Sequence, residues 1–288
     1  MKNPTPPAAC AALTEFNGLP AVCLTTPDGA AAVITLYGAH LVSWKAADGR
    51  ERLYLSERSR FGEGNAIRGG VPVIFPQFAD GGPLPRHGFA RTAEWTLVDA
   101  RHDQGYACAT LRLTDNEATR AIWPHPFVAE LTVMIEGKRL DIEFEVENTG
   151  DQAFAFNAAL HSYFSIAQAN MCSVQGLDGV CYEDRADDGQ LKREDGEALF
   201  VDCEIDRVYR DVGKPLLLWE PERHLAIEAE GFPDVVVWNP WIARCAALKD
   251  MPPDGYRQML CIEAAAVAKP VELAAGESWF GRQTAISL

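Results

Sequence analysis

The chain has 288 residues and carries 26 Lys and Arg against 41 Asp and Glu, which gives a formal net charge of −15. Hydrophobic residues make up 48% and charged residues 23%, a composition typical of a folded globular protein and not of disorder. Such a charge repels nucleic-acid phosphates and anionic lipids, so we expect neither nucleic acid nor a membrane surface as a partner.

The first residues are not typical of a targeting segment. The stretch MKNPTPPAACAALTEF contains three prolines and reaches Glu15 before the apolar core of a signal peptide forms. No uninterrupted apolar stretch approaches the roughly 18 residues of a membrane-spanning helix. We therefore expect a soluble, cytoplasmic protein.

Eight cysteines are spread along the chain without a CxxC pair or a Cys/His pair at metal-ligand spacing. In a reducing cytoplasm free thiols are favoured, and Cys108 and Cys261 lie inside apolar runs that are typical of a core. We expect neither disulfides nor a metal site.

Short, turn-bounded segments typical of β-strands follow one another along the chain. Residues 140–147 alternate apolar and acidic side chains, the period of a half-buried antiparallel strand. Residues 136–138 (Glu-Gly-Lys) before them are typical of a hairpin connection. The predicted strands cover residues 21–26, 32–44, 95–100, 106–114, 127–135, 140–147, 153–163, 216–219, 225–230, 235–238, 258–264 and 278–286.

Such a series of strands predicts an all-β fold, a large antiparallel β-sandwich with few short helices. No linker-like stretch and no internal repeat divides the chain, so we expect a single domain over residues 1–288, with about 1–19 as an N-terminal extension. The acid-rich segment 183–197 is interpreted as a solvated loop.

The most unusual stretch runs from Ile67 to Arg91. Pro72 and Pro76 interrupt what would otherwise be a strand, and Gly69-Gly70 permits backbone conformations that other residues avoid, which indicates a shaped loop. Between residues 58 and 91 five arginines stand against two acids, a local charge of 5 − 2 = +3. The five are Arg58, Arg60, Arg68, Arg86 and Arg91.

Two interpretations of these arginines stay open. The planar fork of arginine holds carboxylate or phosphate by paired, charge-assisted hydrogen bonds, which indicates an anionic ligand. Pairing with acidic neighbours on the surface would explain the same composition.

His161 lies in the strand-like segment 153–163. By strand alternation Ala155, Asn157 and Ala159 share its face, so we expect small and polar neighbours and room for a ligand beside the imidazole. Glu263, the only charge between Arg257 and Lys269, lies either outward in a salt bridge or in an apolar site. Only in the apolar site would desolvation raise its pKa towards that of a general base.

Further polar-aromatic clusters surround Asp206 in DRVY and Trp238 in VVVWNPW. Aromatic faces beside polar groups suit sugars, although tryptophans more often fill cores. Each cluster alone is a weak indication of a sugar site.

Taken together and in order, six segments resemble the hexose-6-phosphate mutarotases, the glucose-6-phosphate 1-epimerase branch of the aldose 1-epimerase family. They are IRGGVPVIFPQF, LPRHGFAR, LHSYF, DRVY, VVVWNPW and CIEAAAV, and the resemblance spans roughly residues 20–286. It implies the galactose mutarotase-like supersandwich.

The resemblance also implies roles for single residues. His161 matches the general acid, Glu263 the general base, and His87 a histidine beside the sugar ring. Contacts to the sugar phosphate or its hydroxyls are implied for Arg68, Arg91 and Asp206, and we expect Trp238 to contact the sugar. Arg86 stands where the family commonly has glutamine, so we expect it either to hold phosphate or to select a different anionic sugar.

The implied reaction interconverts the α and β anomers of a hexose 6-phosphate, most directly D-glucose 6-phosphate. Glu263 would take the O1 proton and His161, as imidazolium, would protonate the ring oxygen, while the arginines hold the phosphate. This chemistry needs no metal, nucleotide or redox cofactor. We expect a monomer whose partner is the small sugar phosphate.

Three other functions stay open from the residues. An epimerase for neutral aldoses would not need the set of arginines. A glycoside hydrolase would need two carboxylates flanking the bond, for which Glu263 and Asp206 are the candidates. A non-catalytic carbohydrate-binding protein would need aromatics and hydrogen bonds, but no buried base opposite an imidazole.

Overall fold

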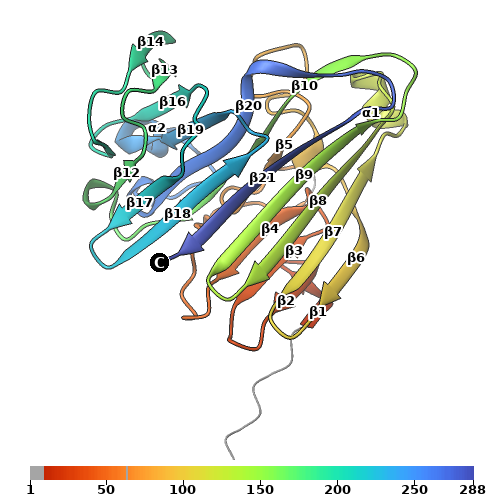
Figure 1. The fold of residues 1–288 in the computed structure, drawn as a ribbon, viewed down its shortest axis with the longest axis horizontal. Coiled ribbons are helices and arrows are strands. Elements are labelled where there is room, and N and C mark those ends of the chain that lie inside the picture. The colour runs from red at the N-terminus through yellow and green to blue at the C-terminus, as the bar shows by residue number, and fades with distance from the viewer. Residues whose placement is uncertain (1–9, 63) are drawn as a thin grey trace, which may run out of the picture.

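The computed structural model describes residues 10–62 and 64–288, and antiparallel strands dominate it (Figure 1). A four-stranded sheet comes first in the chain, in the order β1-β2-β3-β4. Its strands β1 and β2 pack on β6 and β7 of a second, nine-stranded sheet. The strands of the first sheet are β1 Cys10–Phe16, β2 Leu19–Thr25, β3 Ala31–Thr35 and β4 His40–Lys45.

The nine-stranded sheet has the order β15-β12-β17-β18-β21-β9-β8-β7-β6. The pair β8 and β9 forms the expected hairpin, because Glu136 lies opposite Arg139. Apolar side chains of both strands alternate into the core, as the period of two predicts. The strands are β6 Thr96–His102, β7 Ala107–Thr114, β8 Phe127–Glu136, β9 Arg139–Asn148, β12 Ser173–Gln175, β15 Ala198–Phe200, β17 Leu216–Glu220, β18 Arg223–Glu230 and β21 Ser278–Ser287.

The third sheet has the order β14-β13-β16-β19-β20-β10-β5, with β11 pairing β20 off this path. Its centre is β20, whose first eight residues are all buried. The strands are β5 Val73–Ile74, β10 Phe154–Leu160, β11 Tyr163–Ser165, β13 Cys181–Asp184, β14 Gln190–Arg193, β16 Ile205–Tyr209, β19 Asp234–Asn239 and β20 Met259–Leu273.

Helices are short, and the all-β prediction is confirmed. The two α-helices are α1 Glu117–Ile122 and α2 Trp241–Ala247, and single 3-10 turns form at Ala90–Thr92, Ala169–Met171 and Gly255–Gln258. No helix in the described part of the chain is long and apolar enough to cross a membrane. All eight cysteines are free thiols in this structure.

Two predicted strands are each broken in two. The segment 32–44 forms β3 and β4, because Gly38 and Ala39 adopt positive φ and turn the chain. The segment 153–163 forms β10 and β11, and His161 and Ser162 lie in the break. Breaks of this kind depend on the tertiary pairing of each half and leave little mark on apolar periodicity.

Other interpretations need correction. Residues 10–16 form β1, so this part of the expected N-terminal extension belongs to a sheet, while residues 1–9 lie outside the described residues. The stretch 67–91 is partly scaffold, because β5 pairs with β10 and Phe75 makes edge-to-face contacts inside the core. The segment 183–197 contains β14 and is not a free loop. The expectation of a single domain stays a prediction.

Candidate active site

The register of β20 brings His161 and Glu263 together. Leu160 of β10 pairs with Ala264, and Tyr163 of β11 pairs with Cys261, so the break between β10 and β11 lies beside Glu263. The Ile262 amide donates to the Ser162 carbonyl across this break at 3.1 Å. As a result, Nε2 of His161 lies 3.3 Å from Oε1 of Glu263.

Both partners are buried, His161 being 8% and Glu263 1% exposed. Burial, reinforced by the charges of Arg68 and Arg91, lowers the pKa of His161 well below its usual value. Burial, with the nearby Asp206 charge, raises the pKa of Glu263 well above its usual value. Both shifts favour a neutral pair in which Glu263 carries the shared proton. The burial of Glu263 thus excludes the outward position in a surface salt bridge.

The surroundings of His161 differ from the expectation of small and polar neighbours. Its ring stacks on Tyr163 at 4.8 Å and 8°, and it meets Trp238 edge-on at 6.2 Å. The prediction was wrong because the register of β10 shifts between Phe156 and Ala158 and the strand ends before His161, so simple alternation does not reach it.

His87 approaches His161 from the loop after β5, with ring centres 5.6 Å apart. Its Nδ1 accepts a hydrogen bond from the Ala79 amide at 3.2 Å, so Nε2 carries the ring hydrogen. Burial and the neighbouring His161 lower its pKa, which keeps the ring neutral. His87 is therefore a hydrogen-bond donor and not a second acid.

A cavity of about 470 Å³ opens onto this group. Asp206 on β16 and Trp238 on β19 line it, as the sequence predicts, because their strands pair directly and place the two residues opposite each other. Arg68 and Arg86 line it as well. The cavity thus collects every site residue predicted from the sequence except Arg91, which is placed next to it.

Sequence reasoning missed four charged residues of this cavity, Asp80, Glu183, Arg185 and Arg244. Arg185 lies over the Phe78 ring at 5.1 Å and pairs with Glu183 at 3.1 Å. Arg244 of α2 pairs with Asp206 at 3.4 Å. The only signal for Glu183 and Arg185 was the charge density of segment 183–197, which looks like a solvated loop until the pairing of β13 with β16 places it at the cavity. Arg244 stands on α2, where no sequence signal marked it.

Arg68 separates this cavity from a second one of about 360 Å³. The guanidinium of Arg68 donates to the Tyr163 hydroxyl at 2.8 Å and pairs with Asp250 at 3.1 Å. Four cationic side chains line the second cavity against the one carboxylate of Asp250: Arg60, Arg68, Arg91 and Lys249. This region is the most cationic hollow among the cavities described.

Arg91 and Arg86 differ from each other in their settings. Arg91 donates to the Arg86 carbonyl at 2.7 Å, and burial lowers its pKa to about 10, which leaves it charged at neutral pH. Arg86 is exposed and pairs with Asp80. The surface-pair interpretation thus describes Arg86, and the anion-site interpretation describes Arg68 and Arg91 better.

Cys261 completes a buried group with His161 and Glu263, whose ligand atoms lie within 4.8 Å of one another. This donor set would suit a small cation, but the charges that act on His161 are those of Arg68, Arg91 and Arg86. A cationic surrounding of this kind disfavours a metal ion. We therefore interpret the group as an acid–base pair beside a buried thiol.

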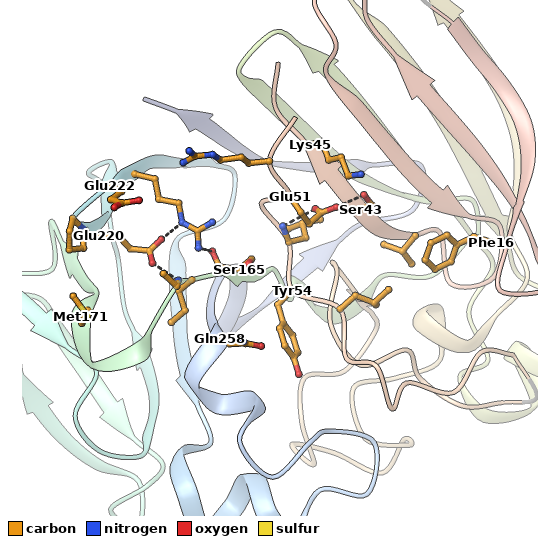
Figure 2. Close-up of a pocket in the computed structure, with 18 residues that line it drawn as sticks. Phe16, Ser43, Lys45, Glu51, Tyr54, Ser165, Met171, Glu220, Glu222 and Gln258 are labelled. Atoms are coloured by element: carbon orange, nitrogen blue, oxygen red, sulfur yellow. Dashed lines mark hydrogen bonds and ion pairs between the residues drawn. The ribbon is translucent and has the colours of Figure 1, made fainter. Parts of the chain in front are cut away.

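A larger cavity of about 860 Å³ lies away from all the predicted site residues (Figure 2). It opens between Phe16 and Lys45 on one side and Glu220 and Glu222 on the other, with Tyr54 between them. Its buried Glu220 is already held by Arg223 and by the Ala167 amide at 2.5 Å. It offers neither a free acid–base pair nor a surplus of cations.

Comparisons with known proteins show what this chain is similar to. The family model described as aldose 1-epimerase matches residues 20–285. A protein of Cenchrus ciliaris named "Putative glucose-6-phosphate 1-epimerase" is 35% identical over 277 residues, covering 92% of this chain and 84% of that protein.

A protein of Escherichia coli with the same name is 38% identical over 239 residues, covering 81% of this chain and 79% of that protein. The crystal structure of a "putative mutarotase" from Salmonella typhimurium superposes with a TM-score of 0.89 at 31% identity, covering 96% of this chain and 93% of that one. The sequence similarity and the similarity of fold therefore indicate the same family.

Proposed function

Because this chain belongs to the aldose 1-epimerase family, we propose that it interconverts the α and β anomers of a hexose 6-phosphate, with D-glucose 6-phosphate as the first candidate. One observation carries the proposal. The buried contact of 3.3 Å between His161 and Glu263 faces a cavity that shares Arg68 with the cationic hollow beside it. An acid, a base and an anion site thus adjoin one another.

The reaction proceeds by proton transfer. Glu263 as carboxylate removes the proton from the O1 hydroxyl, His161 as imidazolium protonates the ring oxygen, and the bond between C1 and that oxygen breaks. C1 of the open aldehyde then turns. Closure reverses both transfers, returning one proton to O1 from Glu263 and one to His161, so the enzyme ends unchanged. His87 donates a hydrogen bond near the ring oxygen as charge moves through it.

The remaining residues of the cavity orient the sugar. Asp206 accepts hydrogen bonds from sugar hydroxyls, and the Trp238 ring lies against the sugar's apolar face. The phosphate binds between Arg68 and Arg91, where cations outnumber carboxylates. Its binding energy holds C1 in line with the acid–base pair. Arg86 contacts the ligand only if its pair with Asp80 opens.

The open alternatives fit these contacts less well. If the substrate were a neutral aldose, the four cationic side chains near the acid–base pair would have no anionic group to bind. A hydrolase would need Glu263 and Asp206 free to flank the bond, whereas Glu263 contacts His161 and Asp206 pairs with Arg244. A purely binding protein has no use for a desolvated carboxylic acid, which costs stability.

The test is anomer exchange of D-glucose 6-phosphate by saturation-transfer NMR at neutral pH, with D-glucose and D-galactose measured alongside. Each rate is compared with that of the enzyme-free solution. We expect acceleration of the phosphorylated sugar far above that of either neutral sugar. Equal acceleration of all three sugars would show that the phosphate is not recognised. No acceleration of any sugar would contradict the proposed reaction.

A further inference from the structure

Burial of the resting acid–base pair favours a different position of its shared proton from the one that the proposed reaction needs. The proposed reaction needs Glu263 as carboxylate and His161 as imidazolium, whereas burial favours a protonated Glu263 and a neutral His161. These two states contain the same number of protons. They differ only by the transfer of one proton across the 3.3 Å contact between Oε1 and Nε2.

The groups around His161 show what sets this proton's position. Tyr163 stacks on the imidazole and receives a hydrogen bond from Arg68, which links the ring to the cationic hollow. His161 Nδ1 and Glu263 Oε2 are buried and have no partner among the described residues. The charged and titratable groups that face the pair are Arg68, Arg86, His87 and Arg91 from the loops after β4 and β5, Tyr163 from β11, Arg185 after β13, Asp206 from β16, and Cys261 from β20.

The arginines act unequally on the two partners. Arg68 and Arg91 are the charges that oppose protonation of His161 most strongly, whereas Glu263 responds mainly to Asp206 and Arg185. The positive field of Arg68 and Arg91 therefore pushes the proton from His161 towards Glu263. An anion that neutralises these two arginines removes this bias.

We propose that the substrate's phosphate dianion, bound at Arg68 and Arg91, transfers the shared proton from Glu263 to His161 and so activates the acid–base pair. The inference rests on the proposed function. Phosphate is then an activator as well as an anchor, and it acts even when it is not covalently attached to the sugar. No proton is gained from or lost to solvent in this step, because the proton only changes its position within the pair.

A two-part substrate tests this directly. D-xylose has the same ring without the C6 group, and phosphite dianion supplies the missing anion. We expect phosphite to raise the enzymatic anomer exchange of D-xylose on the order of tenfold, the population change that one pKa unit gives. Because phosphite is itself a weak acid–base catalyst, each rate is corrected with an enzyme-free sample. Phosphite must also compete with D-glucose 6-phosphate, which shows that it occupies the site.

Arg91→Gln distinguishes activation from anchoring. Removing this positive charge permanently relieves part of the bias against a protonated His161, so we expect D-xylose exchange without phosphite to rise severalfold and its stimulation by phosphite to shrink. An arginine that only anchors phosphate would leave the D-xylose rate unchanged. Arg101→Gln, an exposed arginine on β6, is the matched control for losing one charge.

The position of the proton is observed in the wild-type protein by ¹⁵N NMR of the histidine rings, with the His161 signals assigned from the spectrum of His161→Gln. Phosphite is expected to shift both ring nitrogens of His161 towards imidazolium values. Competition by phosphite without this shift and without faster D-xylose exchange would overturn the inference, while D-glucose 6-phosphate exchange would still support the proposed function. Failure to exchange D-glucose 6-phosphate would overturn both.

Discussion

Nε2 of His161 lies 3.3 Å from Oε1 of Glu263, and the other polar atoms of the pair, Nδ1 and Oε2, have no hydrogen-bond partner among the described residues. Such unpaired buried atoms cost stability. Packing alone would favour apolar side chains at this buried place beside β20, so the burial of the pair supports the proposed acid–base role.

We expect Glu263→Gln to stabilise the fold by about 1 kcal/mol at neutral pH, because the amide, unlike the carboxylate of the unfolded chain, need not take up a proton to be buried. The pKa of Glu263 is raised in the folded state, so above pH 4.5 this carboxyl group binds more protons in the folded protein than in the unfolded chain. The contribution of Glu263 to wild-type stability therefore falls as pH rises, and the advantage of the variant over the wild-type protein grows. Urea unfolding at pH 5 and pH 8 measures the difference in stability between the variant and the wild-type protein, with the exposed Glu222→Gln as control. A less stable variant at pH 8 would contradict the assignment.

Tyr163→Phe should weaken substrate binding more than the chemical step. It removes the hydroxyl that accepts from Arg68 at 2.8 Å and keeps the ring that stacks on His161. A lost hydrogen bond to a charged group corresponds to roughly tenfold in KM for D-glucose 6-phosphate. Steady-state kinetics of the variant beside Tyr182→Phe, which lies outside both cavities, checks this. A fall in kcat with unchanged KM would assign Tyr163 to the chemistry instead.

His87→Asn removes the imidazole ring of His87 and is chosen to preserve the backbone conformation at this position. His87 has φ of 66°, a conformation that asparagine adopts more readily than most residues, so the loop should keep its shape. Loss of the Nε2 donor should lower kcat on the order of 100-fold, as for other donors to a developing charge. The rate is measured with saturating D-glucose 6-phosphate, and circular dichroism confirms the fold. A wild-type kcat would show that His87 only supports the loop.

Gly88→Ala should be far more destabilising than Gly276→Ala, although both glycines have positive φ. A Cβ at Gly88 would lie 2.1 Å from the Phe75 carbonyl oxygen, whereas at Gly276 nothing lies within 4 Å. The left-handed backbone alone costs about 1–2 kcal/mol, so we expect that loss at Gly276 and several kcal/mol more at Gly88. Comparing the two urea midpoints tests this. Equal losses would mean that the approach of Phe75 to Gly88 is not rigid.

The sequence predicts the sheets better than it predicts the site. Residues 140–147 alternate cleanly because one face of β9 is core and the other is solvent, so their periodicity is local. The contact of His161 with Glu263 is not local. It depends on the register of β20 with β10 and β11 and on the break after Leu160, which period-2 alternation does not encode. For the same reason the prediction of small and polar neighbours for His161 was wrong.

The resemblance to a known family supplied the roles that spacing left open. The motif segments identified His161, Glu263, His87 and the arginines as one site, and the fold brings them to adjoining cavities. Arg185 and Arg244 were missed because neither stands in a quoted motif as a candidate. Only the pairing of β13, β16 and β19 turns their segments towards the cavity.

We propose that His161 and Glu263 carry the proton transfers. Saturation-transfer NMR of D-glucose 6-phosphate with wild-type protein, His161→Gln and Glu263→Gln tests this role, after titration shows that each variant still binds the sugar phosphate. We predict rapid anomer exchange with the wild-type protein and exchange at the enzyme-free rate with both variants. Exchange that persists in either variant would contradict the account.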